Sequence, residues 1–146
     1  PLSDLRELPV QKESFDIICL FSVFTHLAPH DYVAMLMLLR PYVKPGGRLI
    51  FSLFLHEVTA GGHGFIDAVD RNMKATLAAQ GQPFVSEPRA DVTPDFIDWD
   101  PSRPLFRAIY SRAYAMRLFE GTGWEVESVN EPEENIQHYM ICKART

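Results

Sequence analysis

Two apolar runs with a helix-like segment between them constrain the fold of this chain more than any other feature. The first run is Phe15–Ser22 and the second is Arg48–Phe54. The first run is nearly continuous, which is typical of a strand covered on both faces in a parallel sheet. Between the runs, Asp31–Tyr42 has the apolar spacing of an amphipathic helix. The pattern therefore predicts a parallel strand–helix–strand unit of an α/β fold.

Prolines and glycines mark the predicted ends of these elements. Pro41 lacks the backbone N–H that a helix interior uses, so we expect the helix to end or kink around Leu39–Pro41. Pro45-Gly46-Gly47 then predicts a break in the chain before the second strand.

A long, proline-rich insert follows this unit. It covers about residues 59–109 and contains one segment of helical composition, Phe65–Gln80. Its later prolines are Pro83, Pro88, Pro94, Pro101 and Pro104. A segment of this length inside a compact α/β domain is usually functional, which favours a lid or a substrate loop. The alternative is a surface insertion that only covers apolar area.

The last part of the chain reads as a helix followed by two strands. Helical spacing and a terminal glycine predict a helix over Tyr110–Gly123. Trp124–Val129 and Gln137–Ala144 alternate in polarity and are joined by a short polar connector. This arrangement favours an antiparallel hairpin.

Composition and charge exclude several classes of function. The 146 residues are 47% hydrophobic and 23% charged, as in an ordinary globular domain. The net charge of −5 argues against a nucleic-acid partner, and no apolar run approaches the length of about 20 residues that spans a membrane. Cys19 and Cys142 lie in predicted buried strands, so we expect core thiols without a disulfide and a cytoplasmic location.

Four stretches resemble, in the correct order, motifs of the class I S-adenosylmethionine-dependent methyltransferase family. The resemblance covers nearly the whole chain apart from the insert. The stretches are Leu8-Pro9 with Ser14-Phe15-Asp16-Ile17-Ile18, His26-Leu27, Lys44-Pro45-Gly46-Gly47, and Phe119-Glu120-Gly121-Thr122-Gly123-Trp124-Glu125-Val126.

The resemblance implies an incomplete Rossmann-like sheet. Residues 1–146 would be the carboxyl-terminal part of a single methyltransferase domain, with the fourth to seventh strands, a terminal antiparallel hairpin and a substrate-side insert at about 59–109. In this family the last strand lies antiparallel beside the fifth. The glycine-rich turn and the acidic residue that hold the cofactor cannot be placed ahead of Ser14. We therefore expect the chain to depend on an amino-terminal half that it does not contain.

The same resemblance assigns residues to S-adenosylmethionine. Asp4 and Leu5 would bind the adenine, the former through its carboxylate and the latter through its backbone N–H. Phe21 and Ser22 end the fourth strand at its carboxyl edge, where open α/β sheets bind ligands, and would lie against the methionine arm. The alternatives are a solvated loop residue at Asp4, a core ring at Phe21 and a helix cap at Ser22.

His26 is the candidate for chemistry, because a neutral imidazole beside the cofactor can take a proton from an acceptor hydroxyl or amine. The alternative is a histidine at a helix start that is bonded to backbone. Tyr110, Ser111 and Arg112 are candidates for substrate binding, or else form an ordinary helix start. We expect no metal site, because His56, Glu57 and His63 lack standard ligand spacing.

These assignments lead to two hypotheses of function. The first is methyl transfer from S-adenosylmethionine to oxygen of a small-molecule or sugar acceptor, after the missing amino-terminal half has completed the domain. The isolated chain is then expected to be inactive. The alternative is a non-catalytic remnant or interaction module that dimerises through the exposed fourth strand, since that strand would form a sheet edge.

Overall fold

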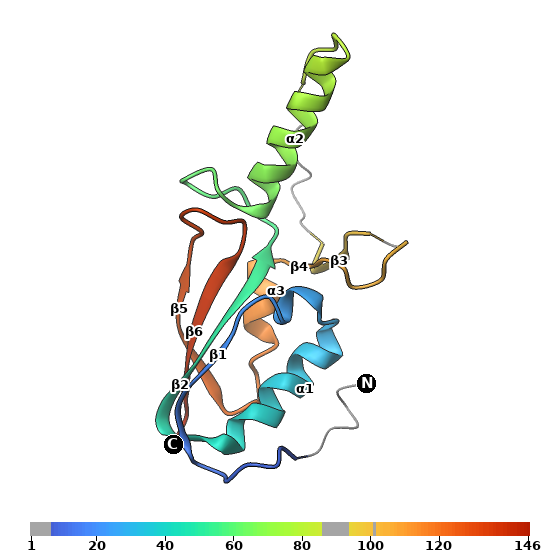
Figure 1. Cartoon of the computed structure of the whole chain (residues 1–146). Coiled ribbons are helices and arrows are strands. Elements are labelled where there is room, and N and C mark those ends of the chain that lie inside the picture. Colours follow the sequence, from blue (N-terminus) through green and yellow to red (C-terminus); the bar gives the residue numbers. More distant parts are fainter. Residues whose placement is uncertain (1–6, 86–93, 101) are drawn as a thin grey trace.

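The computed structural model describes residues 7–85, 94–100 and 102–146. It shows a mixed sheet with helices packed against it and one helix that projects from the body (Figure 1). The elements are β1 Phe15–Leu20, η2 Phe24–His26, α1 Pro29–Leu39, η3 Arg40–Tyr42, β2 Val43–Leu55, α2 Phe65–Ala79, β3 Phe96–Asp98, β4 Ala108–Tyr110, α3 Arg112–Arg117, β5 Trp124–Asn130 and β6 His138–Ala144.

Strand pairing confirms the predicted topology. β1 is parallel to β2, with Leu20 opposite Phe51, so the strand–helix–strand unit is present. β6 runs antiparallel to β2 on its other side, and β5 runs antiparallel to β6. The hairpin of β5 and β6 is therefore as predicted, and so is the antiparallel pairing of the last strand, β6, with β2.

Two short strands in the insert were not predicted. β4 pairs in parallel with the end of β2, where Phe54 lies opposite Ile109, and β3 pairs antiparallel with β4. β4 and β1 thus follow one another along the same edge of β2. Both strands were missed because three residues are too few to show an alternating pattern.

The predicted helix over Tyr110–Gly123 is wrong at both ends, because Tyr110 belongs to β4 and α3 ends at Arg117.

The predicted break at Pro45-Gly46-Gly47 is a bulge within β2 instead. The strand begins at Val43, and the four residues 44–47 stand opposite Asp16 alone. Gly46 has a φ of +75°, which is left-handed backbone. A Cβ atom on Gly47 would lie 2.8 Å from the backbone oxygen of Asp16. These glycines allow the strand to bend close to β1 without ending it.

Helix ends follow the sequence signals. α1 has proline in its first turn, where no N–H is needed, and it ends at Leu39 before the 3₁₀ turn that contains Pro41. The expected end of this helix is confirmed. α2 begins after Gly64, whose N–H donates to the Asp67 carboxylate at 3.1 Å, and it covers nearly the predicted range.

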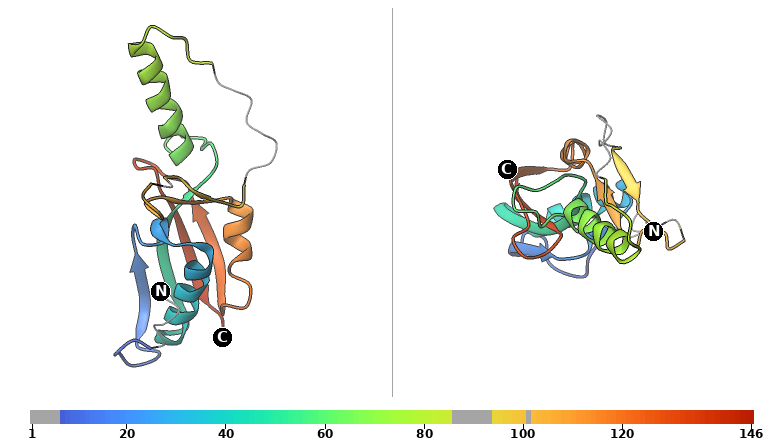
Figure 2. Two further views of the ribbon diagram at one scale, coloured as in Figure 1. Left: turned by 90° about the vertical axis from the view of Figure 1, so that its right-hand side faces the viewer. Right: turned by 90° about the horizontal axis from the view of Figure 1, so that it is seen from above.

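The core lies between one face of the sheet and the helices α1 and α3 (Figure 2). Tyr32, Phe51 and Trp124 are fully buried or nearly so. The rings of Phe24 and Phe51 stack with centroids 3.9 Å apart, and the Trp124 indole N–H donates to the carbonyl of Leu36 at 2.9 Å. The aromatic residues of α1, β2 and β5 thus hold the layers together.

The opposite face of the sheet is covered only in part within the described ranges. The first turn of α2 packs there, with Phe65 and Ile66 against Phe54 and Ile109, and the rest of α2 projects away (Figures 1 and 2). None of the described helices has the length and apolar character that crossing a membrane requires.

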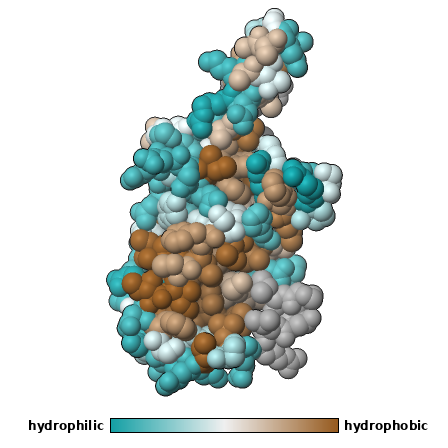
Figure 3. Space-filling model, viewed as in Figure 1, coloured by the Kyte–Doolittle hydropathy of each residue, from teal (hydrophilic) through white to brown (hydrophobic). Residues whose placement is uncertain are grey.

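The predicted double coverage of β1 is wrong for the described chain. Phe15 is 37% exposed and Ile17 is 54% exposed, and apolar surface gathers around β1 in Figure 3. Cys19 is also exposed, although we expected it to be buried. Cys142 is buried as expected, and burial raises the pKa of its thiol to about 12. The difference arises because the core that includes residues of α1 and α3 packs against Ile18 and Leu20, which leaves the alternate positions of β1 exposed.

Replacing a buried and an exposed phenylalanine by alanine is expected to lower the stability by very different amounts. Phe51→Ala removes a fully buried ring and is expected to lower the free energy of unfolding by about 3–5 kcal/mol. Phe21→Ala removes a ring that is 57% exposed, so its expected cost is below about 1 kcal/mol. Urea denaturation followed by circular dichroism measures both. Equal costs would contradict the assignment of Phe51 to the core.

Candidate functional site

Polar and aromatic residues gather where the parallel strands β1 and β2 end. Phe21 and Ser22 follow β1, and Glu57 follows β2. The loop between β5 and β6 reaches the same edge of the sheet, since β5 runs antiparallel to β6. Ligands of open α/β sheets bind at the carboxyl edge of the parallel strands, so this edge is the candidate site.

Ser22 connects the end of β1 with β2 and with Gln137, the residue before β6. Its N–H donates to the hydroxyl of Ser52 on β2 at 2.8 Å, and its own hydroxyl accepts from the Gln137 side-chain amide at 3.0 Å. Its φ is +56°, a left-handed conformation that residues other than glycine rarely adopt. Backbone outliers of this kind concentrate at functional sites. The conformation turns the chain sharply after Phe21, which leaves the aromatic ring exposed.

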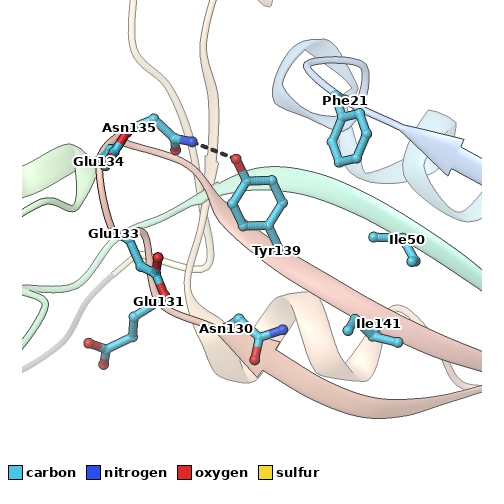
Figure 4. Close-up of a pocket in the computed structure, with 9 residues that line it drawn as sticks. All are labelled: Phe21, Ile50, Asn130, Glu131, Glu133, Glu134, Asn135, Tyr139 and Ile141. Carbon is cyan, nitrogen blue, oxygen red and sulfur yellow. Dashed lines mark hydrogen bonds between the residues drawn. The ribbon is translucent and has the colours of Figure 1, made fainter.

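A pocket of about 730 Å³ opens beside Phe21. Figure 4 shows Phe21 in the turn after β1, and Ile50, Tyr139 and Ile141 on the strands β2 and β6. The acidic and amide side chains lie at the end of β5 and on the loop that follows it. Phe21 meets Tyr139 edge to face, with centroids 6.0 Å apart. The lining residues are Phe21, Ile50, Asn130, Glu131, Glu133, Glu134, Asn135, Tyr139 and Ile141.

The lining combines an apolar floor with a polar rim. Ile50 and Ile141 lie opposite each other on β2 and β6 and form the floor. The amide of Asn135 donates to the Tyr139 hydroxyl, which orients that ring. Volumes of roughly 300–1,000 Å³ are usual for small-molecule sites, and an apolar wall with a few polar groups is their common chemistry. The pocket can therefore hold a small organic molecule.

A charged cluster lies close to this edge. The Glu57 carboxylate accepts from the Arg112 guanidinium through two N–H groups, with Nε at 3.0 Å. The Nε2 atom of His138 lies 2.9 Å from Glu57 Oε1. His138 is fully buried, and its Nδ1 has no hydrogen-bond partner among the described residues. The cluster ties the start of the insert to α3 and β6.

The pKa of Glu57 reports on this cluster. Burial alone would raise the pKa, but hydrogen bonds from His138 and Arg112, together with their charges, lower it from 4.5 to about 2. Glu57 therefore stays ionised throughout the neutral range. In this cluster it acts as a fixed acceptor for its two neighbours and not as a proton donor.

His26 faces the insert. It ends the 3₁₀ turn η2, it is exposed, and its Nδ1 lies 3.1 Å from the carbonyl oxygen of Leu105. A carbonyl only accepts, so Nδ1 carries the hydrogen in this contact, and in the neutral ring Nε2 then holds a lone pair. His26 does not line the pocket beside Phe21. Its catalytic role stays a prediction.

The three predicted substrate residues lie at the junction between the insert and the body. Tyr110 is fully buried, and its hydroxyl donates to the carbonyl of Leu27. Burial raises the pKa of that hydroxyl well above its usual range. Ser111 caps α3 by accepting from the N–H of Tyr114 at 3.1 Å. Arg112 contacts Glu57, and none of the three lines the pocket.

Two predicted cofactor residues lie outside the described residues, namely Asp4 and Leu5. Phe21 and Ser22 are placed at the carboxyl end of β1 as expected. Within the described ranges no group of three or more His, Cys, Asp or Glu residues is arranged to hold a metal ion.

Sequence reasoning missed the pocket rim and the charged cluster. Residues 130–135 were interpreted as a connector, although their run of glutamates was a visible signal. Glu57 was weighed as a metal ligand and set aside. Its position directly after a strand predicted to end at the ligand edge was the signal that could have singled it out. Nothing in the sequence indicates that His138 is its neighbour.

Comparisons with known proteins agree with this geometry. Residues 2–51 match a family model described as a methyltransferase domain. No curated protein sequence matches the chain. Residues 2–51 contain β1 and most of β2, so the match covers the first crossover unit of the sheet.

Solved structures share the fold over nearly the whole chain at low identity. A possible exported protein of Bordetella parapertussis is 12% identical, with a TM-score of 0.58, and the match covers 92% of this chain and 40% of that one. CalO1, a methyltransferase in calicheamicin biosynthesis solved in its SAH-bound form, is 14% identical with a TM-score of 0.55, covering 97% and 32%. The mitomycin 7-O-methyltransferase MmcR is 14% identical with a TM-score of 0.56, covering 92% and 31%.

The chain thus spans about a third to two fifths of the length of these proteins. At such identities the likeness shows the fold alone, which is part of a Rossmann-like methyltransferase fold. The predicted resemblance to methyltransferases is therefore confirmed for the fold.

The charged cluster predicts a specific dependence of stability on pH. Because the folded pKa of Glu57 is lowered, its contribution is complete above about pH 4.5 and is lost as the pH falls toward about 2. Glu57→Gln is expected to cost about 1–3 kcal/mol at pH 7 and to flatten the acid limb of the stability curve.

Urea denaturation between pH 7 and pH 2.5 measures this dependence. Asp16→Asn is the matched control, since Asp16 and its partner Lys44 are both exposed and such pairs contribute little. Similar acid limbs for the parent and for Glu57→Gln would show that the cluster does not stabilise the fold.

Proposed function

We propose that this chain, which contains part of a methyltransferase domain, takes part in transferring the methyl group of S-adenosylmethionine to oxygen of a small-molecule or sugar acceptor. It does so when a further segment supplies the glycine-rich cofactor turn. The observation that carries the proposal is the order of β1, β2, β6 and β5, with Phe21 lining a pocket at the carboxyl edge.

The comparisons support the reaction class. The family model matches residues 2–51 as a methyltransferase domain. Among the structural neighbours, MmcR is a mitomycin 7-O-methyltransferase, and CalO1 is a methyltransferase of calicheamicin biosynthesis. MmcR methylates an oxygen of mitomycin, which favours a small-molecule acceptor and oxygen as the methylated atom here.

The residues present fit one part of the cofactor. The exposed ring of Phe21 offers an apolar wall for the methionine arm, and the pocket rim carries carboxylates that suit a positively charged group. S-adenosylmethionine supplies a methyl group that is already activated on a sulfonium. Residues 1–14, ahead of β1, contain no glycine-rich turn for close approach of the backbone, so in this proposal a further segment supplies that part of the cofactor site.

Methyl transfer requires mainly that the acceptor be aligned with the methyl group of the cofactor. Well-oriented groups recover roughly 7–11 kcal/mol of a barrier, and a general base adds about 10²- to 10⁴-fold. The Ser22 contacts to Ser52 and Gln137 fix the edge against which both reactants would be aligned. His26 holds a hydrogen at Nδ1 against Leu105, so its Nε2 is the atom that would accept the acceptor's proton.

A second candidate function is a non-catalytic interaction module. The observation that favours it is the exposure of Phe15, Ile17 and Cys19 along β1. A module of this kind would bind other chains through that strand and would not require the cofactor.

Cofactor binding and activity test the first proposal. The 146-residue chain is expected to show no micromolar affinity for S-adenosylmethionine in calorimetry, because half of the cofactor site is lacking. The polypeptide extended by its upstream coding sequence is expected to bind the cofactor and to methylate small-molecule hydroxyls, detected by mass spectrometry. Micromolar binding by the chain alone would contradict the proposal, as would an extended polypeptide that neither binds nor transfers.

His26 is tested in the same extended polypeptide. His26→Ala is expected to reduce the rate by about 10²- to 10⁴-fold if it removes a general base. The matched control is His30→Ala, since His30 is exposed and lies 3.2 Å from Asp31 at the start of α1. Equal rates for the two variants would remove His26 from the mechanism.

A further inference from the structure

The backbone of the insert is strained at Leu105, the residue that contacts His26. Leu105 has a φ of +58°, in the left-handed region that residues other than glycine rarely adopt. The N–H of Phe106 donates to the carbonyl of Arg103 at 3.0 Å, so residues 103–106 form a tight turn. Proline at its second position and a positive φ at its third are the signature of a type II turn, which usually has glycine at the third position. A leucine there must be stabilised by contacts from elsewhere in the chain.

Asp98 supplies such a contact. It is the last residue of β3, and both of its carboxylate oxygens lie 3.1 Å from the backbone nitrogen of Leu105, whose N–H they accept. A hydrogen bond to a carboxylate is stronger than one between neutral groups. Asp98 is itself held in place, because it lies opposite Ala108 in the antiparallel pair of β3 and β4. The carboxylate therefore connects the strained turn to the sheet.

The carbonyl of Leu105 in turn selects one form of the His26 ring. Nδ1 of His26 lies 3.1 Å from this oxygen, so Nδ1 carries the hydrogen and Nε2 of the neutral ring keeps its lone pair. The side chain is exposed, and an exposed imidazole in water exchanges between its two tautomers. Which nitrogen is protonated is set by the hydrogen bond that the ring makes. The position of the Leu105 carbonyl thus decides which nitrogen can accept a proton.

We propose that Asp98 is a positioning residue for His26 and acts through the left-handed backbone of Leu105. The carboxylate holds the turn, the turn places the carbonyl, and the carbonyl keeps the hydrogen on Nδ1. Catalytic bases are commonly oriented by a third group, and here a carboxylate does so through one backbone residue. This inference rests on the proposed function, in which His26 takes the proton of the acceptor. It extends that function by giving the insert a part in orienting the base.

The insert also fixes the backbone beside His26. Tyr110 of β4 is fully buried, and its hydroxyl donates to the carbonyl of Leu27, the next residue after His26. Because β3 and β4 are paired, the ring of His26 and the backbone beside it are both held by one hairpin of the insert. A segment that only covered apolar area would not require two polar contacts to the same short turn. The contacts therefore favour an orienting role for this hairpin.

The tautomer of His26 tests the inference in the 146-residue chain without cofactor. At a pH where the ring is neutral, long-range proton–nitrogen correlation spectra distinguish Nδ1–H from Nε2–H, and loss of the signal in His26→Ala assigns it. The parent chain is expected to be predominantly Nδ1–H. Asp98→Ala should move the greater part of the population to Nε2–H. Asp98→Asn should retain the parent tautomer, because its amide oxygen can still accept from the N–H of Leu105.

The matched control is Asp100→Ala in the same loop. Among the described residues, the Asp100 carboxylate accepts from the N–H of Ser102 at 3.1 Å and from Nε of Arg103 at 2.8 Å. The tautomer of His26 should therefore be unchanged, and circular dichroism verifies that the variants are folded. Equal shifts in Asp98→Ala and Asp100→Ala would overturn the specific role of Asp98. A parent chain that is predominantly Nε2–H, or an Asp98→Ala variant that keeps the parent tautomer, would overturn it as well.

Kinetics of the extended polypeptide separate this inference from the proposed function. Asp98→Ala is expected to lower kcat by about 2- to 10-fold, the loss that one hydrogen bond accounts for, without changing KM for the acceptor. Asp98→Asn should restore most of the rate. Unchanged kcat for Asp98→Ala in an active polypeptide would overturn the part that Asp98 has in the reaction. An inactive parent polypeptide would instead contradict the proposed methyl transfer, and the tautomer measurement would still decide whether Asp98 orients His26.

Discussion

The long strand β2 is the constraint on which the rest of the structure depends. It pairs with β1 and β4 along one edge and with β6 along the other, so three of the other described strands are placed directly by it. Its side chains face the core at every second position, and Leu49, Phe51, Leu53 and Leu55 are all fully buried. The cluster at its end and the pocket on its other face follow from the same register, since Glu57 follows the strand and Ile50 lies in its middle.

Strong local signals made the main elements predictable. The apolar runs at β1 and β2, the helix that ends before Pro41, and the alternating strands of the hairpin are all fixed by residues close together in the sequence. β3 and β4 were missed because three residues hold too little pattern. The bulge in β2 was missed because proline and glycine mark both the end of a strand and an irregularity within it. Cys19 was expected to be buried because an apolar run does not reveal whether its neighbours belong to the same chain.

The candidate site was predictable only where it depends on strand ends. Phe21 and Ser22 follow a recognisable strand, so their place at the ligand edge followed from topology. Glu57, Arg112 and His138 are brought together by the pairing of β2 with β6 and by the start of α3, and they are far apart in the sequence. Their mutual contacts, and the low pKa of Glu57, depend on that tertiary arrangement. The left-handed backbone of Ser22 is equally invisible in sequence, because nothing in the residue type requires it.

The exposed edge of β1 links stability to both proposed activities. Apolar side chains such as Ile17 and Phe21 are unfavourable in water, so any chain that pairs with β1 gains free energy by covering them. A chain bound at this edge, as in the interaction module proposed above, would have to dissociate before a completing segment could pair with β1 there. Assembly of a methyltransferase site would then be favoured by excess of the completing segment over the competing chain. The two proposed functions therefore make competing use of the same strand.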